Sequence, residues 1–355
     1  MKRGMSVQIR KQYGDFRLEV DFSARPGEVL ALLGASGCGK STTLKCIAGI
    51  HRPDWGRIEL DGETLFDSER RVDLPPQERR VGYLFQQYAL FPNMTVEQNI
   101  LACLGRLEKS RRRERVRELA ALMRLEGLER LRPAQLSGGQ QQRAALARIL
   151  ASEPRVILLD EPLAALDLYL RWQIEPELRD VLERFGGPAV WVSHDRGEVY
   201  RNCQRVCVLT NGTSAPARDT KELMADPVTV SAAKLSGCKN YVPVRPGREP
   251  GTVEVPDWGL TLAASAPWRE GVTTLGIRAN HVRPAGERAV NAFFCRTVRV
   301  TEDVFTILVA LRPEGAAEDA PTLRMELGKD AWNALEDKDR LRVAVRAEDL
   351  LLLEN

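Results

Sequence analysis

The chain has 355 residues, of which 43% are hydrophobic and 28% are charged, and its formal net charge is +3. This length exceeds that of one ordinary domain and predicts a large domain followed by a smaller one. The composition excludes a disordered chain, and so mild a positive charge does not indicate nucleic-acid binding. No apolar run approaches the roughly 18 residues of a membrane-spanning helix, and the N-terminus lacks the apolar core of a signal peptide. We therefore expect a cytoplasmic protein.

The first elements follow the order strand, glycine-rich loop, helix. Residues 7–9 and 16–22 alternate apolar and polar side chains, as half-buried strands do. Residues 29–33 are continuously apolar, which is typical of a strand buried on both faces. The glycine-rich residues 34–40 interrupt this run, and we expect a helix over residues 41–49.

A second helical region is expected over residues 106–130, which are rich in Arg, Glu and Leu at helical spacing. Its basic cluster at residues 109–113 can suggest nucleic-acid binding. No aromatic residues interleave with the cluster, however, and Glu114 and Glu118 balance its charge. A solvated helix face is therefore the better interpretation.

Two further buried strands are expected at residues 156–159 and 189–192, with a helical pattern at 169–185 between them. Alternating strands and helices predict an α/β fold with a largely parallel sheet covered on both faces. Pro176 is expected to kink this helix or to lie near one of its ends.

The composition changes after about residue 232, where proline and glycine become frequent. Several short β-rich segments with turn residues between them predict a small all-β barrel or sandwich. We expect the first domain to cover residues 1–235 and the second to cover residues 236–355. The β-rich segments are residues 273–277, 293–300, 306–311, 323–327 and 341–345.

Residues 34–41 match the phosphate-loop pattern G-x-x-x-x-G-K-[ST]. Glycines let backbone N–H groups curl around phosphate oxygens, and the helix that follows directs its positive end at the same phosphates. Lys40 is expected to reach the β and γ phosphates of ATP, and the Ser41 hydroxyl to bind Mg²⁺. The predicted ATP-binding residues of this segment are Gly34, Ala35, Ser36, Gly37, Cys38, Gly39, Lys40, Ser41 and Thr42.

The segment Val-Ile-Leu-Leu-Asp-Glu at residues 156–161 has the form of a Walker B strand. An apolar strand delivers two adjacent carboxylates to the edge of the sheet. Asp160 can hold Mg²⁺ directly or through water, and Glu161 can polarise the water that attacks the γ-phosphate. Because the pair lies downstream of a phosphate loop, we predict that both carboxylates act in nucleotide hydrolysis.

Residues 136–140, Leu-Ser-Gly-Gly-Gln, resemble the signature of the ATP-binding-cassette (ABC) ATPases. Ser137 stands where a helix N-cap is expected, ahead of a helix at residues 141–150, and this helix start is a second anion site. The resemblance implies a head-to-tail homodimer with two ATP molecules at its interface. The resemblance also implies which residues contact the ATP of the partner subunit: Ser137, Gly138, Gly139 and Gln140.

Three more segments resemble motifs of this family. Residues 85–92 resemble the Q-loop, in which Gln86 contacts Mg²⁺ and the attacking water, and the resemblance implies a helical subdomain at about residues 87–136. Residues 163–167 resemble the D-loop, in which Asp167 helps to link the two active sites. Residues 192–195 resemble the switch motif, in which His194 bonds the γ-phosphate and orients the water.

Tyr13 is our choice for the aromatic residue that stacks on adenine. Phe16 is the alternative, but it opens an alternating strand and can face the core. Trp172, beside the D-loop, is expected to pack against the protein, and His51 and His281 are expected to be structural.

One cassette with a β-rich C-terminal extension resembles the importer ATPases that serve periplasmic binding proteins. Residues 276–281 are similar to their C-terminal barrels, called TOBE or molybdopterin-binding-like domains. Residues 193–201, 235–240 and 257–259 are similar to the molybdate/tungstate branch. Sulfate or thiosulfate, polyamines, iron and sugars stay open as cargo. Proline is frequent in the family at the place of Ala35, which supplies no catalytic side chain.

The resemblance also implies partners. They are a second copy of the chain, two transmembrane permease subunits and, indirectly, a periplasmic or lipoprotein solute-binding protein; no nucleic acid is expected. The chain would lie on the inner face of the cell membrane, and an oxyanion bound in its C-terminal domain would regulate it. One alternative is a soluble cassette ATPase without membrane partners. A P-loop kinase is a third option, but it leaves the signature at residues 136–140 unexplained.

Overall fold

The computed structural model describes residues 4–105, 107–164, 166–286 and 289–355. The chain divides into two compact units, Met1–Lys221 and Glu222–Asn355. The boundary therefore lies earlier than the expected one between residues 235 and 236. The compositional change used to place that boundary begins only after two short helices, α7 (Thr220–Ala225) and α8 (Val230–Leu235).

Helix α8 packs within the second unit. Its residue Ala233 is fully buried in an apolar cluster with Leu353 of strand β23 (Leu350–Glu354). The helix also contacts strand β17 (Val272–Ile277). Burial of this apolar side chain against the second unit explains why the helix belongs there rather than to the cassette.

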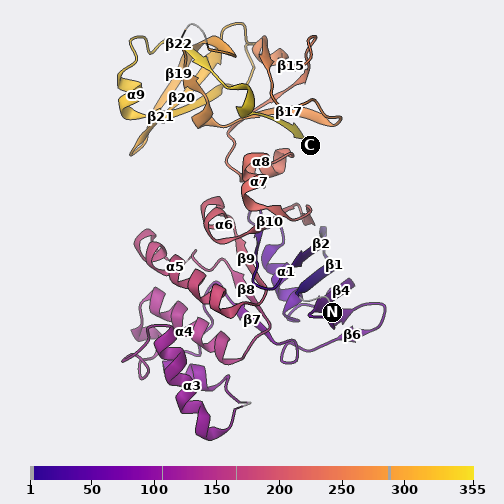
Figure 1. Cartoon of the computed structure of the whole chain (residues 1–355), viewed down its shortest axis with the longest axis vertical. Helices are drawn as coiled ribbons and strands as arrows, with labels where there is room; N and C mark the ends of the chain where they lie inside the picture. Colours follow the sequence, from indigo (N-terminus) through magenta and orange to yellow (C-terminus); the bar gives the residue numbers. More distant parts are fainter. Residues whose placement is uncertain (1–3, 106, 165, 287–288) are drawn as a thin grey trace. The chain divides into compact units, whose positions relative to one another are not determined.

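The first unit contains one large mixed sheet, drawn in the lower half of Figure 1. Strands β10, β3, β9, β8 and β7 are parallel neighbours in that order, whereas β6, β5, β4, β1 and β2 are antiparallel. The expected largely parallel sheet is thus extended by an antiparallel part, in which short turns join β1 to β2 and β4 to β5. The strands are β1 (Met5–Tyr13), β2 (Phe16–Ala24), β3 (Val29–Leu33), β4 (Trp55–Leu60), β5 (Glu63–Asp67), β6 (Val72–Asp73), β7 (Val81–Leu84), β8 (Val156–Asp160), β9 (Ala189–Ser193), β10 (Arg205–Thr210), β11 (Thr213–Ser214) and β12 (Arg218–Asp219).

The parallel strands explain where the site forms. Strands β3, β8 and β9 are buried at every residue, as strands of a parallel sheet covered on both faces are. Their carboxyl ends meet at one edge, since Leu33 pairs with Ser193 and Asp160 pairs with Val192. The phosphate loop, the carboxylate pair and the switch segment therefore begin side by side.

The helices of the first unit confirm the main sequence predictions. The expected helix at residues 169–185 is α5, and Pro176 lies inside it rather than near an end. The helix expected at residues 106–130 is shorter, because the backbone turns at Arg124, which has a φ of 50°. None of the described helices is long and apolar enough to cross a membrane. The helices are α1 (Lys40–Ile47), α2 (Val96–Leu101), α3 (Lys109–Leu122), α4 (Gly138–Ala151), α5 (Leu168–Phe185) and α6 (Arg196–Asn202).

The second unit confirms the predicted small all-β domain, to which it adds the short helix α9 (Lys329–Asn333). Its strands form three sheets around an apolar core in which Trp258 is fully buried. The Trp258 indole donates to the Pro321 carbonyl at 2.7 Å, so its polar atom is satisfied. The remaining strands are β13 (Asn240–Pro243), β14 (Arg245–Pro246), β15 (Thr252–Val255), β16 (Leu260–Ala263), β18 (Arg283–Pro284), β19 (Ala292–Glu302), β20 (Thr306–Pro313), β21 (Leu323–Gly328) and β22 (Arg340–Ala344).

Candidate nucleotide-binding site

The phosphate loop joins β3 to α1. Gly39, the N-cap of α1, has a φ of 105°, a conformation that L side chains rarely adopt. A Cβ at Gly34 would clash with the carbonyl oxygen of Leu209, so this position also requires glycine. Lys40 is 5% exposed, and its Nζ donates to the carbonyls of Gly34 and Ala35 at 2.8 Å each. The loop thus folds around the buried ammonium group of Lys40, beside the N–H groups at the start of α1.

Asp160 connects the loop to the Walker B strand. The Ser41 hydroxyl donates to Asp160 Oδ1 at 2.7 Å, and the Tyr83 hydroxyl donates to Asp160 Oδ2 at 2.8 Å. Burial and the negative charge of Asp160 raise the pKa of Tyr83 far above its usual range, so the phenol stays protonated and keeps donating. Tyr83 was not predicted from the sequence, because the pairing of β7 with β8 that brings it to Asp160 is set by the strand order of the folded sheet.

The arrangement fits Mg²⁺. Ser41 and Asp160 provide two oxygen ligands side by side, which is the chemistry that Mg²⁺ prefers. Ser41 and Asp160 would hold the ion. Bound Mg²⁺ would neutralise part of the negative charge on the β and γ phosphates. Gln86, the third predicted ligand, is exposed in the turn after β7, and no hydrogen bond joins it to either residue in the described part of the chain.

Glu161 and His194 meet at the carboxyl ends of β8 and β9. His194 Nδ1 lies 3.3 Å from Glu161 Oε1. Glu161 has a φ of 48°, in the left-handed region, and its N–H donates to the Val192 carbonyl at 3.1 Å. Backbone strain of this kind persists where the surrounding structure enforces it, often at functional sites. The structure therefore brings together two side chains that the sequence placed in separate motifs.

The signature segment begins helix α4. As expected, Ser137 is the N-cap: its hydroxyl accepts from the Gln140 N–H at 3.3 Å. The Gln140 side chain accepts from the Ser137 N–H at 2.9 Å, so the two residues form a capping box. The helix begins at Gly138, three residues before the expected start. A Cβ at Gly139 would lie 3.2 Å from Ile174 Cδ1, which shows how closely α4 approaches α5.

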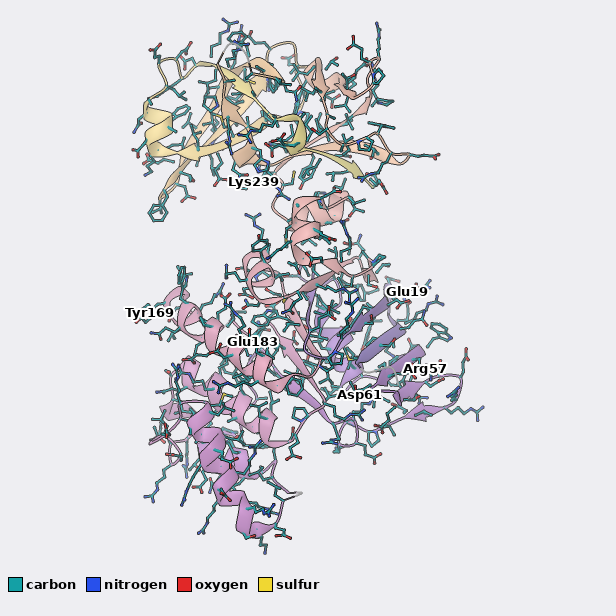
Figure 2. All side chains as sticks on the ribbon, viewed as in Figure 1. Glu19, Arg57, Asp61, Tyr169, Glu183 and Lys239 are labelled. Carbon is teal, nitrogen blue, oxygen red and sulfur yellow. The ribbon has the colours of Figure 1, made fainter. Side chains whose placement is uncertain are left out.

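Asp167 of the D-loop is the N-cap of α5 and accepts from the Leu170 N–H at 2.9 Å. Ala165, in the same motif, lies outside the described residues. The expected packing of Trp172 is wrong: the side chain is 76% exposed, because the apolar face of α5 is formed by other residues, such as Leu178. Tyr169 is 72% exposed and points away from the ribbon (Figure 2).

Tyr13 and Phe16 have different surroundings. Tyr13 is 40% exposed, and its hydroxyl lies 2.6 Å from His51 Nδ1. Phe16 is partly buried against the core, and a Cβ at Gly39 would lie 3.2 Å from its ring. Phe16 therefore packs beside the phosphate loop, and the choice of Tyr13 as the adenine-stacking residue stays a prediction.

The Q-loop is held by an arginine that the sequence analysis did not single out. Tyr88 and Ala89 have φ values of 57° and 47°, which are uncommon for non-glycine residues. Arg148 of α4 donates to the carbonyls of Ala89 at 2.7 Å and Tyr88 at 3.3 Å. Nothing local in the sequence pairs an arginine with a loop some sixty residues earlier.

Known proteins similar to this chain agree with this geometry. The sequence matches the family described as "ABC transporter" over residues 18–164. It is 39% identical over 312 residues to the sulfate/thiosulfate import ATP-binding protein CysA 2 of Chromobacterium violaceum, covering 86% of this chain and 82% of that protein. The chain belongs to the ABC transporter family. Accordingly, it is an ATPase and an ATP-binding subunit of the import type.

Other relatives carry different cargo names. The molybdenum import ATP-binding protein ModC of Paramagnetospirillum magneticum is 40% identical over 223 residues, covering 63% of this chain and 61% of that protein. Relatives named for spermidine/putrescine and for Fe(3+) import have comparable identity. A dimeric, post-hydrolysis structure of the cassette MJ0796 bound to ADP and Pi has a TM-score of 0.52 and 30% identity, covering 61% of this chain and 98% of that one.

Proposed function

We propose that the chain hydrolyses ATP through the described site to power the uptake of a small oxyanion, with molybdate or tungstate as the first candidate. One observation carries the assignment of the site. The Ser41–Asp160 hydrogen bond, at 2.7 Å, and the Glu161–His194 contact, at 3.3 Å, lie at the ends of neighbouring strands. An ion-binding pair beside a base and its orienting histidine is what hydrolysis of MgATP requires.

Each residue then has a distinct task. Lys40 and the start of α1 bind the β and γ phosphates, and Ser41 and Asp160 hold Mg²⁺. Glu161 accepts a proton from the water as its oxygen attacks the γ-phosphorus, while the bond to the bridging β-phosphate oxygen breaks. The products are ADP and phosphate. His194 bonds the γ-phosphate, and Tyr13 stacks on the adenine.

We infer that two copies bind two ATP molecules head to tail. Support comes from the α4 N-terminus, where Gly138 and Gly139 offer N–H groups, and from the dimeric structure of MJ0796. ATP binding would favour the closed dimer, and hydrolysis would reopen it. Two permease subunits, fed by a periplasmic or lipoprotein solute-binding protein, would form the path. Phe91 and Met94, which are 45% and 39% exposed, suit docking of a permease helix at the inner face of the membrane.

Two observations support an oxyanion. Relatives named for molybdenum and for sulfate or thiosulfate are similar to this chain. In addition, His281, Arg283 and Arg346 line a cavity of about 470 Å³ in the second unit, together with Glu348. Among the described lining residues, two arginines face one carboxylate, which lies 3.4 Å from Arg346. This balance favours an anion over a polyamine, and an oxyanion bound in this cavity would regulate the enzyme.

Sulfate or thiosulfate is the second candidate cargo. The match to CysA 2 extends over 86% of the chain, whereas the match to ModC covers 63%. Polyamine, iron or sugar import stays a further option, and a cassette ATPase without membrane partners is the remote one.

The experiment is reconstitution with the cognate permease and binding protein in vesicles. We expect molybdate or tungstate to stimulate ATP hydrolysis and to enter the vesicles. Stimulation by sulfate alone would move the assignment to the second candidate. Stimulation by spermidine or Fe³⁺ would overturn the oxyanion proposal, and failure of the chain to assemble with the permease in the vesicles would overturn the transport role.

A further inference from the structure

Two of the buried glutamates in the cassette lie on neighbouring helices, α5 and α6, and the proposed hydrolysis uses neither. Glu175 of α5 is 6% exposed and Glu198 of α6 is 3% exposed. Buried carboxylates are costly unless charged or hydrogen-bonding groups face them. Their partners therefore show what each glutamate holds in place.

Glu175 forms a tight link between α5 and α6. Arg201 donates to its two carboxylate oxygens at 2.6 and 2.9 Å, and Asn202 Nδ2 donates to Oε1 at 2.7 Å. A bidentate arginine pair with a third donor fixes both position and direction. We regard Glu175 as a rigid connection that stabilises the packing of these helices.

Glu198 forms a different link. The Ser193 hydroxyl donates to its Oε2 at 2.8 Å, whereas Arg171 Nη1 lies 3.4 Å from Oε1. The same Nη1 lies 3.4 Å from Asp195 Oδ2, and Arg171 Nε is buried without a hydrogen-bond partner in the described part of the molecule. Arg171 is thus shared by two carboxylates at long distances, and its geometry can adjust.

The contacts of Arg171 with Glu198 and Asp195 lie between two segments of the proposed site, the D-loop and the switch segment. Arg171 lies one turn after Asp167, to whose carbonyl its N–H donates at 2.9 Å. Its two carboxylate partners act on both sides of His194: Asp195 follows it, and Glu198 holds Ser193, which precedes it. A shift of the first turn of α5 therefore changes the charge that faces the switch segment.

We propose that Arg171 is a positioning residue that transmits the state of the D-loop to His194 through Glu198 and Asp195. The proposal rests on the role proposed above for His194 and on the role that the family resemblance implies for Asp167. When the partner subunit engages the D-loop, Arg171 draws the two carboxylates toward α5 and holds the His194 ring on the γ-phosphate side. ATP binding does not need this contact, but the hydrolytic step does.

The test compares two arginines on one helix. In Arg171→Gln we expect kcat to fall about tenfold, as for a small misplacement of a catalytic group, with the KM for ATP unchanged. Arg179→Gln, the matched change at an exposed arginine of α5, is expected to leave both parameters at wild-type values. Arg171→Lys keeps the charge and should recover part of the lost kcat.

A double-mutant cycle separates positioning from stability. Glu198→Gln should lower kcat as Arg171→Gln does, and the double variant should be no slower than the slower single one. Glu175→Gln serves as the stability reference, since it should lower the thermal midpoint while kcat at low temperature stays near wild type. The proposal is overturned if Arg171→Gln behaves like Arg179→Gln, or if the kcat losses of Arg171→Gln and Glu198→Gln multiply in the double variant. It is also overturned if Arg171→Gln, like Glu175→Gln, lowers the thermal midpoint and leaves kcat at low temperature near wild type.

A parallel measurement keeps this inference distinct from the proposed function. His194→Ala should abolish hydrolysis. Wild-type hydrolysis in His194→Ala would overturn the switch assignment itself. An inactive His194→Ala together with a fully active Arg171→Gln would overturn only the link.

Discussion

The two units of the molecule treat buried polar groups in opposite ways. In the cassette, buried charges such as Lys40, Asp160 and Glu198 gather near the ends of the parallel strands. In the described part of the second unit, the buried polar residues are the uncharged Ser236 and Asn240. Because a buried charge must be compensated, we infer that the cassette keeps these groups for chemistry, while the second unit acts through its surface.

The largest expected effect concerns Glu161, the proposed general base in the cassette. Glu161→Gln removes the proton acceptor but preserves the shape of the side chain, so phosphate release should fall about 100-fold or more. ATP should still bind, and we expect the dimer to accumulate in size-exclusion chromatography with ATP. Hydrolysis at the wild-type rate would show that Glu161 is not the base.

Two helix caps, one in each unit, give a matched prediction. Ser137→Ala and Thr229→Ala each remove a hydroxyl that accepts a helix N–H, at 3.3 and 3.2 Å. Each should cost about 1 kcal/mol of stability in denaturant titrations. Only Ser137→Ala should also lower kcat, by about tenfold, because we propose that the N-terminus of α4 contacts the ATP of the partner subunit. Equal kcat values in the two variants would contradict the assigned role of the signature.

The surface role of the second unit predicts anion binding in its arginine-lined cavity. Calorimetry of the full chain with molybdate should give measurable heat. The variant with Arg283→Gln and Arg346→Gln together should weaken this binding about tenfold, since each change removes a cation. Basal ATP hydrolysis without molybdate should stay unchanged. If the variant gives the same heat as the wild type, molybdate does not bind in this cavity. If neither protein gives heat, the proposal of a regulatory anion site is wrong.

The smallest effect concerns the adenine platform. Burial and the nearby Lys45 and Lys11 lower the pKa of His51, so its ring is neutral at pH 7 and can accept the Tyr13 hydrogen bond. As the pH falls through this lowered pKa, the protonated ring can no longer accept from Tyr13, and the hydrogen bond must reverse direction. This change should raise the KM for ATP about twofold, comparable to one weak hydrogen bond. Tyr13→Phe should lose this pH dependence. An unchanged KM profile would argue against Tyr13 as the stacking residue.

Local patterns predicted much of the fold. The apolar run at residues 29–33 is β3, and the helical pattern at residues 169–185 is α5, because burial and helical periodicity are written into consecutive residues. The domain boundary and the exposure of Trp172 were not predicted correctly, since both depend on which surface packs against another. Composition and neighbouring motifs do not carry that information.

The sequence by itself predicted the roles of residues 34–41, 136–140 and 160–161, because each motif is a short pattern of consecutive residues. Tertiary structure decided the connections between them. Tyr83 on Asp160, Arg148 on the Q-loop carbonyls and Arg171 between two carboxylates join residues far apart in the chain. Such contacts depend on strand order and helix packing, which bring these side chains within hydrogen-bond distance only after the whole cassette has folded.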